Sequence, residues 1–240
     1  ILVNNKIVIK IDENNFNLIC EYYYYSTSQY SPAVIMLDIK NAFLAYYYIE
    51  GKPVKHIKFQ LFNDICSLNY NEPPFNQYGY LNSLCSSWQD FIINLFNNSV
   101  SIIPSNLISK QIIDKIIYII KHYLNNYEFN PKLIHGDLGI YNLIIHNDKL
   151  VGIIDPYPII GNPLYDLLFF FTSSKQLLLN NNLHDIFDLS QYSLQDILVL
   201  FLPILINRIS REYKNNSSYY FYIKYLKKLF DLYDFDLLFP

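Results

Sequence analysis

Apolar positions in the first fifty residues come in short runs, and their spacing predicts a small β-rich unit. Two runs within residues 1–11 are rich in β-branched side chains and are separated by Asn4 and Asn5, which favour a hairpin turn. Residues 16–25 instead carry apolar side chains at helical spacing. The predicted order is therefore strand, strand, helix, strand, strand. The last two strands are expected over residues 33–37 and 42–49.

Beyond residues 51–53, where a glycine and a proline interrupt the pattern, the apolar spacing is mostly helical. Residues 111–125 have isoleucines three and four positions apart and are expected to form an amphipathic helix. The apolar run at 197–206 contains a proline and is too short to cross a membrane, so we expect a buried core helix. Residues 70–80, which include two adjacent prolines, are expected to form an irregular surface connection.

One short interval of the helical part has the pattern of a β-hairpin. Residues 143–146 and 150–154 are β-type runs joined by Asn147 and Asp148, both of which tolerate turn geometry. Helices are expected to resume near Pro163. The polar residues that can carry chemistry flank this hairpin on both sides.

The composition is that of a folded globular chain. Of 240 residues, 52% are hydrophobic and 16% are charged, which excludes a disordered chain. The net charge of −3 is close to zero and gives no reason to predict binding to nucleic acid or to an anionic membrane. The three cysteines, Cys20, Cys66 and Cys85, have the spacing of neither a disulfide framework nor a zinc site. Because the start of the chain also lacks the pattern of a signal peptide, we expect a reducing, cytoplasmic location.

An Asp and an Asn five residues apart precede the hairpin, and a second Asp follows it. A hairpin brings its outer ends together, so Asn142 and Asp155 are placed to share one cation through the oxygen ligands that Mg²⁺ requires. Asp137 then faces the same cleft from a loop, where it can accept a proton from a hydroxyl group. An amide and a carboxylate on the metal, with a free carboxylate beside them, form the arrangement used in phosphoryl transfer by kinases.

The segment HGDLGIYN, which contains Asp137, is followed by IDP and then by GNPLYDL, and together they resemble the aminoglycoside phosphotransferase family. Members of this family are small-molecule kinases with a bilobal, protein-kinase-like fold. The resemblance implies that Asp137 is the catalytic base and that Asn142 and Asp155 are magnesium ligands. It also implies that His135 and Asp166 support the catalytic loop.

Two segments further upstream agree with this family. Ile7 to Lys10 is similar to the strand whose lysine holds the nucleotide phosphates, and Glu21 stands where the family has the acid that pairs with this lysine. Residues 45–52 resemble the hinge strand whose backbone meets the adenine, which implies nucleotide contacts at Tyr47 and Ile49. The resemblance therefore implies ATP or GTP as the co-substrate and Mg²⁺ as the cofactor.

The expected fold class is α+β, with the bilobal architecture of the protein kinases. A small N-terminal antiparallel β lobe over residues 1–50 leads through a hinge at about 45–52 into a larger, mostly helical lobe over 53–240. The larger lobe holds the catalytic loop at 135–142 and the metal-binding segment at 154–166. No glycine-rich, phosphate-covering loop precedes the nucleotide-binding lysine, so we expect either a truncated fragment of a kinase or a degenerate relative.

Local residues favour an aminoglycoside-like acceptor over the other acceptors of such kinases. Fructosamine kinases usually have a Trp where Gly139 stands, and choline kinases usually have an Asn at the position of Gly136. An antibiotic-type or sugar-alcohol acceptor is therefore the leading hypothesis, with fructosamine-type and choline-type kinases as alternatives. The acidic tail near the C-terminus is more simply explained as a solvated surface than as part of an acceptor pocket.

The remaining alternatives belong to other classes. A pseudokinase would keep the fold without turnover, which the absent phosphate-covering loop favours and the retention of the polar site residues disfavours. A protein kinase is disfavoured because Pro156 and Tyr157 follow Asp155 where protein kinases have Phe and Gly. A hydrolase is disfavoured because the sequence has no motif for a catalytic nucleophile. The expected partners are a nucleotide and a small-molecule hydroxyl acceptor, rather than nucleic acid or a membrane.

Overall fold

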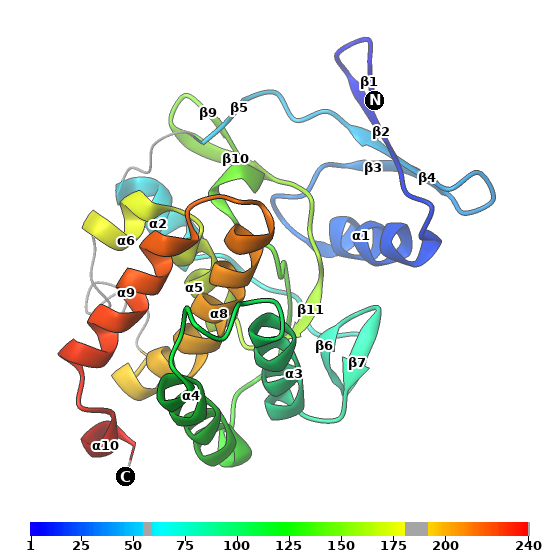
Figure 1. Cartoon of the computed structure of the whole chain (residues 1–240). Coiled ribbons are helices and arrows are strands. Elements are labelled where there is room, and N and C mark those ends of the chain that lie inside the picture. Colours follow the sequence, from blue (N-terminus) through cyan, green and yellow to red (C-terminus); the bar gives the residue numbers. More distant parts are fainter. Residues whose placement is uncertain (55–58, 181–191, 240) are drawn as a thin grey trace. The chain divides into compact units, whose positions relative to one another are not determined.

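The computed structural model describes residues 1–54, 59–180 and 192–239, and its helices and strands are labelled in Figure 1. The chain divides into two compact units according to its internal contacts. Unit 1 consists of Ile1–Leu84 and Pro131–Phe170, and unit 2 consists of Cys85–Asn130 and Phe171–Pro240. Unit 1 is therefore built from two segments that are far apart in the sequence.

Unit 1 begins with a four-stranded antiparallel sheet in the order β1-β2-β4-β3, with helix α1 (Asn15–Thr27) between β2 and β3 in the sequence. The turn from β1 to β2 has Asn4 and Asn5 at φ values of 50° and 52°, in the left-handed region that asparagine adopts at low cost. The predicted order of strand, strand, helix, strand, strand is confirmed. The strands are β1 (Leu2–Val3), β2 (Ile7–Ile11), β3 (Val34–Asp38) and β4 (Phe43–Tyr47).

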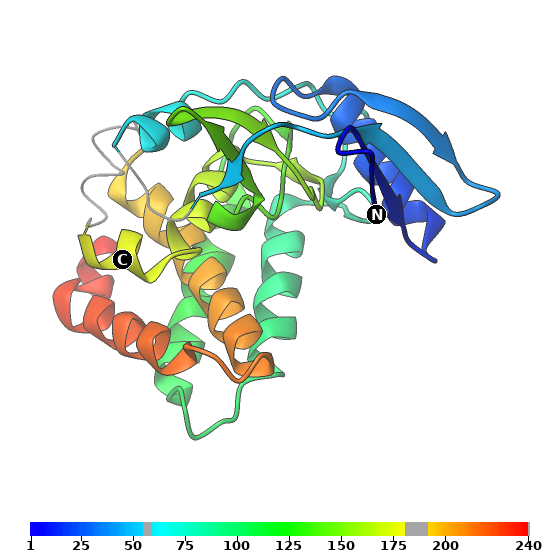
Figure 2. The same ribbon diagram turned by 90° about the horizontal axis from the view of Figure 1, so that it is seen from above.

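Helix α1 lies against one face of this sheet, as both views show (Figures 1 and 2). Leu18 of the helix and Leu44 of β4 are fully buried in the core between them. Burial of such side chains contributes roughly 1.5–3 kcal/mol each, so this packing fixes the helix on the sheet. Glu21 and Tyr25 also lie on the buried side of α1, with 3% and 4% of their surface exposed. The helix thereby carries a carboxylate and a hydroxyl into the interior of unit 1.

The second sheet of unit 1 has the order β10-β9-β5 and contains the predicted hairpin. Asn147 and Asp148 form its turn at φ values of 50° and 62°, which again suits Asx residues. The hairpin prediction is confirmed, and a strand from the first segment of unit 1 extends the sheet. The strands are β5 (Lys52–Pro53), β9 (Leu143–His146) and β10 (Lys149–Ile153).

The third sheet of unit 1 corrects one prediction. Residues 70–80 were expected to be irregular, but Tyr78–Tyr80 forms strand β6, which pairs with β11. A three-residue strand is too short to show alternation. Of its two neighbours in the sheet, β7 is equally short and β11 lies in the other segment of the unit, so the sequence pattern gives no signal. The sheet has the order β7-β6-β11-β8. Its strands are β6 (Tyr78–Tyr80), β7 (Ser83–Cys85), β8 (Lys132–Ile134) and β11 (Ile159–Gly161).

Two helices complete unit 1. In α2 (Phe59–Cys66), the Phe62 ring lies 6.4 Å from the ring of Phe170, which belongs to α5 (Leu164–Thr172). The buried Asn162 side chain caps α5 by accepting the Leu164 N–H at 2.9 Å. This start of α5 confirms the predicted return to helices near Pro163.

Unit 2 is built around α8 (Leu194–Lys214), which contacts α3 (Trp88–Val100), α4 (Lys110–Tyr123) and α9 (Tyr219–Leu232). All residues from Ile197 to Ile206 in α8 are buried, which confirms the predicted core helix. The predicted amphipathic helix over residues 111–125 is confirmed by α4. Shorter elements are α6 (Lys175–Asn180), α10 (Phe235–Leu238) and the 3₁₀ turn η1 (Leu124–Asn126). Within the described residues, no helix combines the length and the apolar character needed to cross a bilayer.

The α+β fold class is confirmed. The predicted lobe boundary near residues 51–53 stays a prediction, because the N-terminal sheet and the hairpin segment fall within the same compact unit. Part of the predicted helical lobe, residues 55–58 and 181–191, lies outside the described residues.

Candidate active site

Lys10 and Glu21 form an ion pair between β2 and α1. Side chains two positions apart on a strand point to the same face, so Lys10 shares the α1-covered face with Val8, which packs into the core. The Lys10 Nζ lies 2.6 Å from Glu21 Oε2. The Glu21 side chain is only 4% exposed, whereas that of Lys10 is 32% exposed. The lysine therefore remains accessible while its partner is fixed in the interior.

Lys10 also contacts Asp155, 145 positions further along the chain, with 3.0 Å between Nζ and Oδ1. Burial lowers the pKa of Lys10, but the charges and hydrogen bonds of Glu21 and Asp155 raise it by more, so the net pKa lies above its ordinary value. Burial raises the pKa of the Glu21 carboxyl, and the Lys10 ammonium opposes that rise. Lys10 is thus a permanent cation held by two acids, and it is placed to meet a further anion.

The backbone of Asp155 has an uncommon conformation. Its φ of 54° lies in the left-handed region, which Asp adopts more readily than most residues. Its N–H donates to the Tyr25 hydroxyl of α1 at 2.9 Å. The carboxylate itself is 51% exposed. Asp155 therefore has a fixed backbone and a side chain that is open to a ligand.

Asp137 and Asn142 lie at the two ends of a short loop and are bonded to each other. The Asn142 Nδ2 donates to the Asp137 carbonyl oxygen at 2.8 Å and reaches Asp137 Oδ2 at 3.5 Å. The Asn142 carbonyl oxygen accepts the N–H of Ile154 at 2.9 Å, directly beside Asp155. These bonds bring the predicted base and the two predicted metal ligands to one end of the hairpin.

His135 holds this loop through hydrogen bonds to its backbone and to that of Ile154. Its Nδ1 accepts the N–H of Asp137 at 3.2 Å, and its Nε2 lies 3.0 Å from the Ile154 carbonyl oxygen. Because Nδ1 is an acceptor, the proton is on Nε2, which donates to Ile154. Burial lowers the pKa of His135 to about 4. The ring is therefore neutral near pH 7 and holds the loop by hydrogen bonds.

Asp166, in the first turn of α5, holds the backbone of the same loop. Its two carboxylate oxygens accept the N–H groups of His135 at 2.7 Å and Gly136 at 2.8 Å. Burial raises the pKa of Asp166 to about 7, although both N–H groups act in the opposite direction. Gly136 has a φ of +79°, and a Cβ there would lie 2.0 Å from the Tyr157 carbonyl oxygen. The loop therefore needs glycine at this position.

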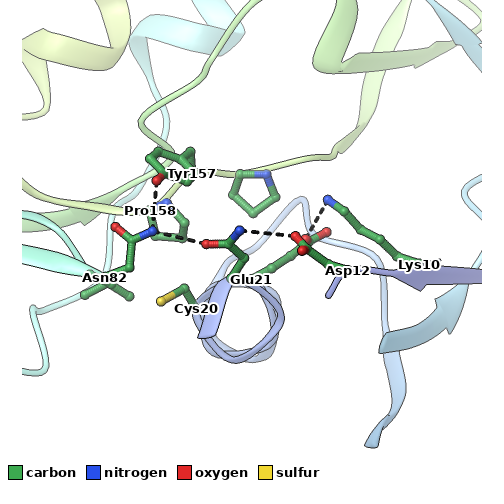
Figure 3. A pocket seen from close by; sticks show the side chains of 10 residues that line it. Lys10, Asp12, Cys20, Glu21, Asn82, Tyr157 and Pro158 are labelled. Atoms are coloured by element: carbon green, nitrogen blue, oxygen red, sulfur yellow. Dashed lines mark hydrogen bonds and ion pairs between the residues drawn. The ribbon is translucent and has the colours of Figure 1, made fainter. Parts of the chain in front are cut away.

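A pocket with about 410 Å³ of empty space opens beside the Lys10–Glu21 pair (Figure 3). Asn82 lies at its edge and donates through Nδ2 to the Tyr157 hydroxyl at 2.8 Å and to Asn17 Oδ1 at 3.1 Å. Asn17 in turn donates to Asp12 Oδ2 at 3.2 Å. These bonds connect α1 to the residues that follow Asp155.

The two residues predicted to meet adenine lie at the end of β4 and just beyond it. Tyr47 is 55% exposed, and its N–H donates to the Ala33 carbonyl oxygen at 2.9 Å. Ile49 packs over Gly152 of β10, where an added Cβ would lie 2.5 Å from Ile49 Cδ1. Tyr47 thus bonds within the first sheet, whereas Ile49 connects the segment after β4 to the second sheet.

A protein-family model for fructosamine kinase matches residues 75–177, an interval that holds Asp137, Asn142, Asp155 and Asp166. No curated protein matches the sequence at a significant level. Several solved structures match nearly the whole chain. The streptomycin–ATP ternary complex of APH(2")-IIa is 17% identical, with a TM-score of 0.58 over 99% of this chain and 88% of that chain.

Two further similar structures are those of an aminoglycoside phosphotransferase and a putative fructosamine-3-kinase. A thermostable mutant of aminoglycoside phosphotransferase APH(4)-Ia, in ternary complex with AMP-PNP and hygromycin B, is 13% identical with a TM-score of 0.62, over 94% of this chain and 86% of that one. A putative fructosamine-3-kinase from Haemophilus somnus 129PT is 19% identical with a TM-score of 0.61, over 98% of this chain and 83% of that chain. The chain has the fold of the protein-kinase-like small-molecule kinases. The family-model match and these neighbours together indicate a small-molecule kinase, which confirms the predicted resemblance at the level of this superfamily.

The donor set of this small-molecule kinase fold suits a nucleotide-bound Mg²⁺. The described residues contain no cluster of three or more His, Cys, Asp and Glu side chains that could enclose a metal ion. However, Mg²⁺ typically takes one or two protein oxygens together with phosphate oxygens. The Nδ2 of Asn142 is bonded to Asp137, which leaves its Oδ1 for a cation, and the Asp155 carboxylate is half-exposed. These two residues fit that limited role.

Two residues of the candidate site, Tyr25 and Asn82, were not predicted from the sequence. Tyr25 is four positions after Glu21 on α1, and this spacing places both side chains on one helix face. That spacing is a usable signal once Glu21 has been singled out. Asn82 has no comparable signal, because its hydrogen-bond partners Asn17 and Tyr157 are 65 and 75 positions away in the sequence.

Proposed function

We propose that the protein is a phosphotransferase that moves the terminal phosphate of ATP or GTP to a hydroxyl group of a small molecule. The observation that carries this proposal is the position of Lys10, whose Nζ lies 2.6 Å from Glu21 and 3.0 Å from Asp155. The three residues come from a strand, a helix and a distant loop. Lys10 was predicted to hold the nucleotide phosphates, Glu21 to pair with Lys10, and Asp155 to bind magnesium, and their convergence supports a site for a nucleotide.

Asp137 is proposed to orient the acceptor hydroxyl and to accept its proton. As the new O–P bond forms, the bond to the leaving nucleoside diphosphate breaks, and the hydroxyl proton passes to the Asp137 carboxylate. The bonds from Asn142 to Asp137 and from Asp137 to His135 support this role, because they fix the loop that carries the carboxylate. The neutral His135 ring holds the loop and takes no proton itself.

Lys10 is proposed to bind the phosphates that are not transferred. Its ammonium stays protonated between two acids, so it supplies a fixed positive charge, and Glu21 prevents it from swinging away. Asn142 and Asp155 would hold Mg²⁺, which neutralises charge on the nucleotide phosphates when it is bound. Tyr47 and Ile49 remain the proposed contacts for the base.

The proposed acceptor is a polyhydroxylated amine. Aminoglycosides remain the leading class, since several similar structures are aminoglycoside phosphotransferases with comparable coverage. Fructosamines are a second candidate, because the family model that matches residues 75–177 is that of fructosamine kinase, even though Gly139 replaces the usual Trp. Both classes present sugar hydroxyls next to amines, so a panel of both tests the proposal.

The first experiment measures thermal stability with Mg·ATP and Mg·GTP, for the natural sequence and for Asp155→Asn. A ligand at a hundredfold excess over its dissociation constant stabilises a protein by about 2.7 kcal/mol. For a chain of this size the midpoint should rise by roughly 5 to 10 °C. We expect a magnesium-dependent rise that Asp155→Asn reduces or abolishes. A rise that is equal in both proteins would remove Asp155 from the site.

The second experiment follows transfer of labelled phosphate from each nucleotide to aminoglycosides and to a fructosamine. Transfer that requires Asp137 supports the kinase proposal, and the product identifies the acceptor class. Magnesium-dependent binding without transfer to any member of the panel would favour the pseudokinase alternative. No binding of either nucleotide would contradict both.

A further inference from the structure

Tyr25 connects the two halves of the proposed nucleotide site. It lies one helical turn after Glu21 on α1, and its hydroxyl oxygen accepts the N–H of Asp155 at 2.9 Å. The residue is only 4% exposed. Its ring packs edge-on against Tyr46 of β4, with 5.3 Å between the ring centroids and 70° between the planes. The hydroxyl is therefore held in place by the packing of the ring.

The hydrogen bond is made by the backbone N–H of Asp155, a residue whose backbone conformation is unfavourable by itself. A left-handed residue other than glycine costs roughly 1–2 kcal/mol, and Asp155 has a φ of 54°. Burial raises the pKa of Tyr25 well above its ordinary value, so the hydroxyl keeps its proton and can donate while it accepts. Glu21, which lies one turn earlier on the same helix, holds Lys10 with 2.6 Å between Oε2 and Nζ. Helix α1 thus carries both the hydroxyl that bonds the backbone of Asp155 and the acid that holds Lys10.

We propose that Tyr25 is a positioning residue for the metal-binding carboxylate of this kinase. It fixes the backbone of Asp155 relative to the Lys10–Glu21 pair, so that the carboxylate is already oriented when Mg·nucleotide arrives. This inference rests on the proposed function, because it concerns the affinity of that site for the metal. The hydroxyl group performs this role, and the ring only carries it.

The test is Tyr25→Phe, which keeps the ring and its contact with Tyr46 and removes only the hydroxyl oxygen. Tyr23→Phe is the matched control, because Tyr23 is a partly buried tyrosine of the same helix that packs against the same core. The measurement is the Mg²⁺ concentration that gives half of the nucleotide-induced rise in the thermal midpoint. A second readout is the midpoint of each protein without metal or nucleotide.

We expect Tyr25→Phe to raise the half-saturating Mg²⁺ concentration about tenfold, the effect of losing one well-placed hydrogen bond. Tyr23→Phe should leave that concentration unchanged. If Tyr25→Phe and Tyr23→Phe both behave like the natural sequence in Mg²⁺ titration, the inference is wrong while the proposed function stands. If the natural sequence itself shows no magnesium-dependent stabilisation by ATP or GTP, the proposed function fails and the inference fails with it.

Amide hydrogen exchange provides a test that needs no variant. In the natural sequence without ligand, the Asp155 N–H is bonded to a buried hydroxyl and should exchange much more slowly than that of an exposed loop. Exchange of the Asp155 amide at the rate of an unstructured peptide would overturn the inference, even if Tyr25→Phe proved too unstable to titrate.

Discussion

Lys10 and Glu21 are joined by an ion pair of 2.6 Å whose acidic partner is almost entirely buried. Exposed ion pairs contribute little to stability, but a pair with one buried member depends strongly on both charges. In the proposed kinase site the pair positions the Lys10 ammonium next to Asp155.

Replacing Glu21 with Gln should weaken nucleotide binding. The substitution keeps the side-chain shape but removes the charge that restrains Lys10, so the dissociation constant for Mg·ATP or Mg·GTP should rise about tenfold, as for the loss of one charge-assisted bond. Titration calorimetry measures this directly. Glu13→Gln is the control, because Glu13 is exposed and the change in net charge is the same. Equal affinities of the two variants would contradict the role of Glu21.

Replacing Asp137 with Asn should separate chemistry from binding. The amide cannot accept the hydroxyl proton, so the turnover number should fall by about 10²–10⁴-fold, the usual contribution of a positioned base. Nucleotide affinity should stay within about twofold, since Lys10 and Asp155 are untouched. Asp148→Asn, in the exposed β9–β10 turn, should keep full turnover. If Asp137→Asn lost nucleotide binding together with turnover, the residue would belong to the nucleotide site instead.

Replacing Gly136 with Ala should destabilise the fold. Its φ of +79° strains any other residue, and the added Cβ would lie 2.0 Å from the Tyr157 carbonyl oxygen, so the free energy of unfolding should drop by about 2 kcal/mol or more. Denaturant unfolding of the whole chain measures this. Gly139→Ala in the same loop is a suitable comparison, because the three atoms nearest to its Cβ would belong to the side chain of the exposed Tyr141, which can move. Equal losses in both variants would refute the backbone argument.

Stability should depend on pH through His135. Burial lowers the pKa of His135 to about 4, below its ordinary value of 6.5. Between these values the unfolded chain binds the proton and the folded chain does not, so the free energy of unfolding decreases as pH falls from about 6.5 to about 4. A shift of this size corresponds to about 3 kcal/mol in total.

Urea unfolding of the natural sequence and of His135→Gln between pH 7.5 and 4 tests this linkage. Glutamine does not titrate, so the stability difference between the two proteins should shrink by that amount across the window. A difference that stays constant with pH would show that His135 titrates in the folded protein as it does in the unfolded chain.

Local patterns were sufficient to predict most of the fold. The hairpins at Asn4–Asn5 and Asn147–Asp148 were predictable because Asx residues tolerate the left-handed turn and the flanking runs are β-rich. Helix α4 was predictable from its isoleucine spacing. In contrast, β6 and its neighbour β7 have three residues each, which is too few for a local pattern to distinguish them from loops.

The candidate site was predictable only through its motif. The contact between Lys10 and Asp155 spans 145 positions, and no periodicity connects them. The family resemblance supplied that connection, and the structure places the two side chains within 3.0 Å. Tyr25 shows the limit of this approach. Its spacing from Glu21 indicates a shared helix face, but not the hydrogen bond between its hydroxyl and the Asp155 amide.

The discontinuity of unit 1 has a consequence for synthesis on the ribosome. Leu18 and Leu44 share their core with Leu133 and Ile160, which emerge only after the whole of residues 85–130 has been made. Until then the N-terminal sheet and α1 have an unfilled apolar face and no Asp155 for Lys10 to meet. This surface stays exposed on the nascent chain until the second segment has been synthesised, so we expect a chaperone to bind it during that time. Stalling translation between the two segments should therefore yield an aggregation-prone intermediate, and the candidate site should form in one late step.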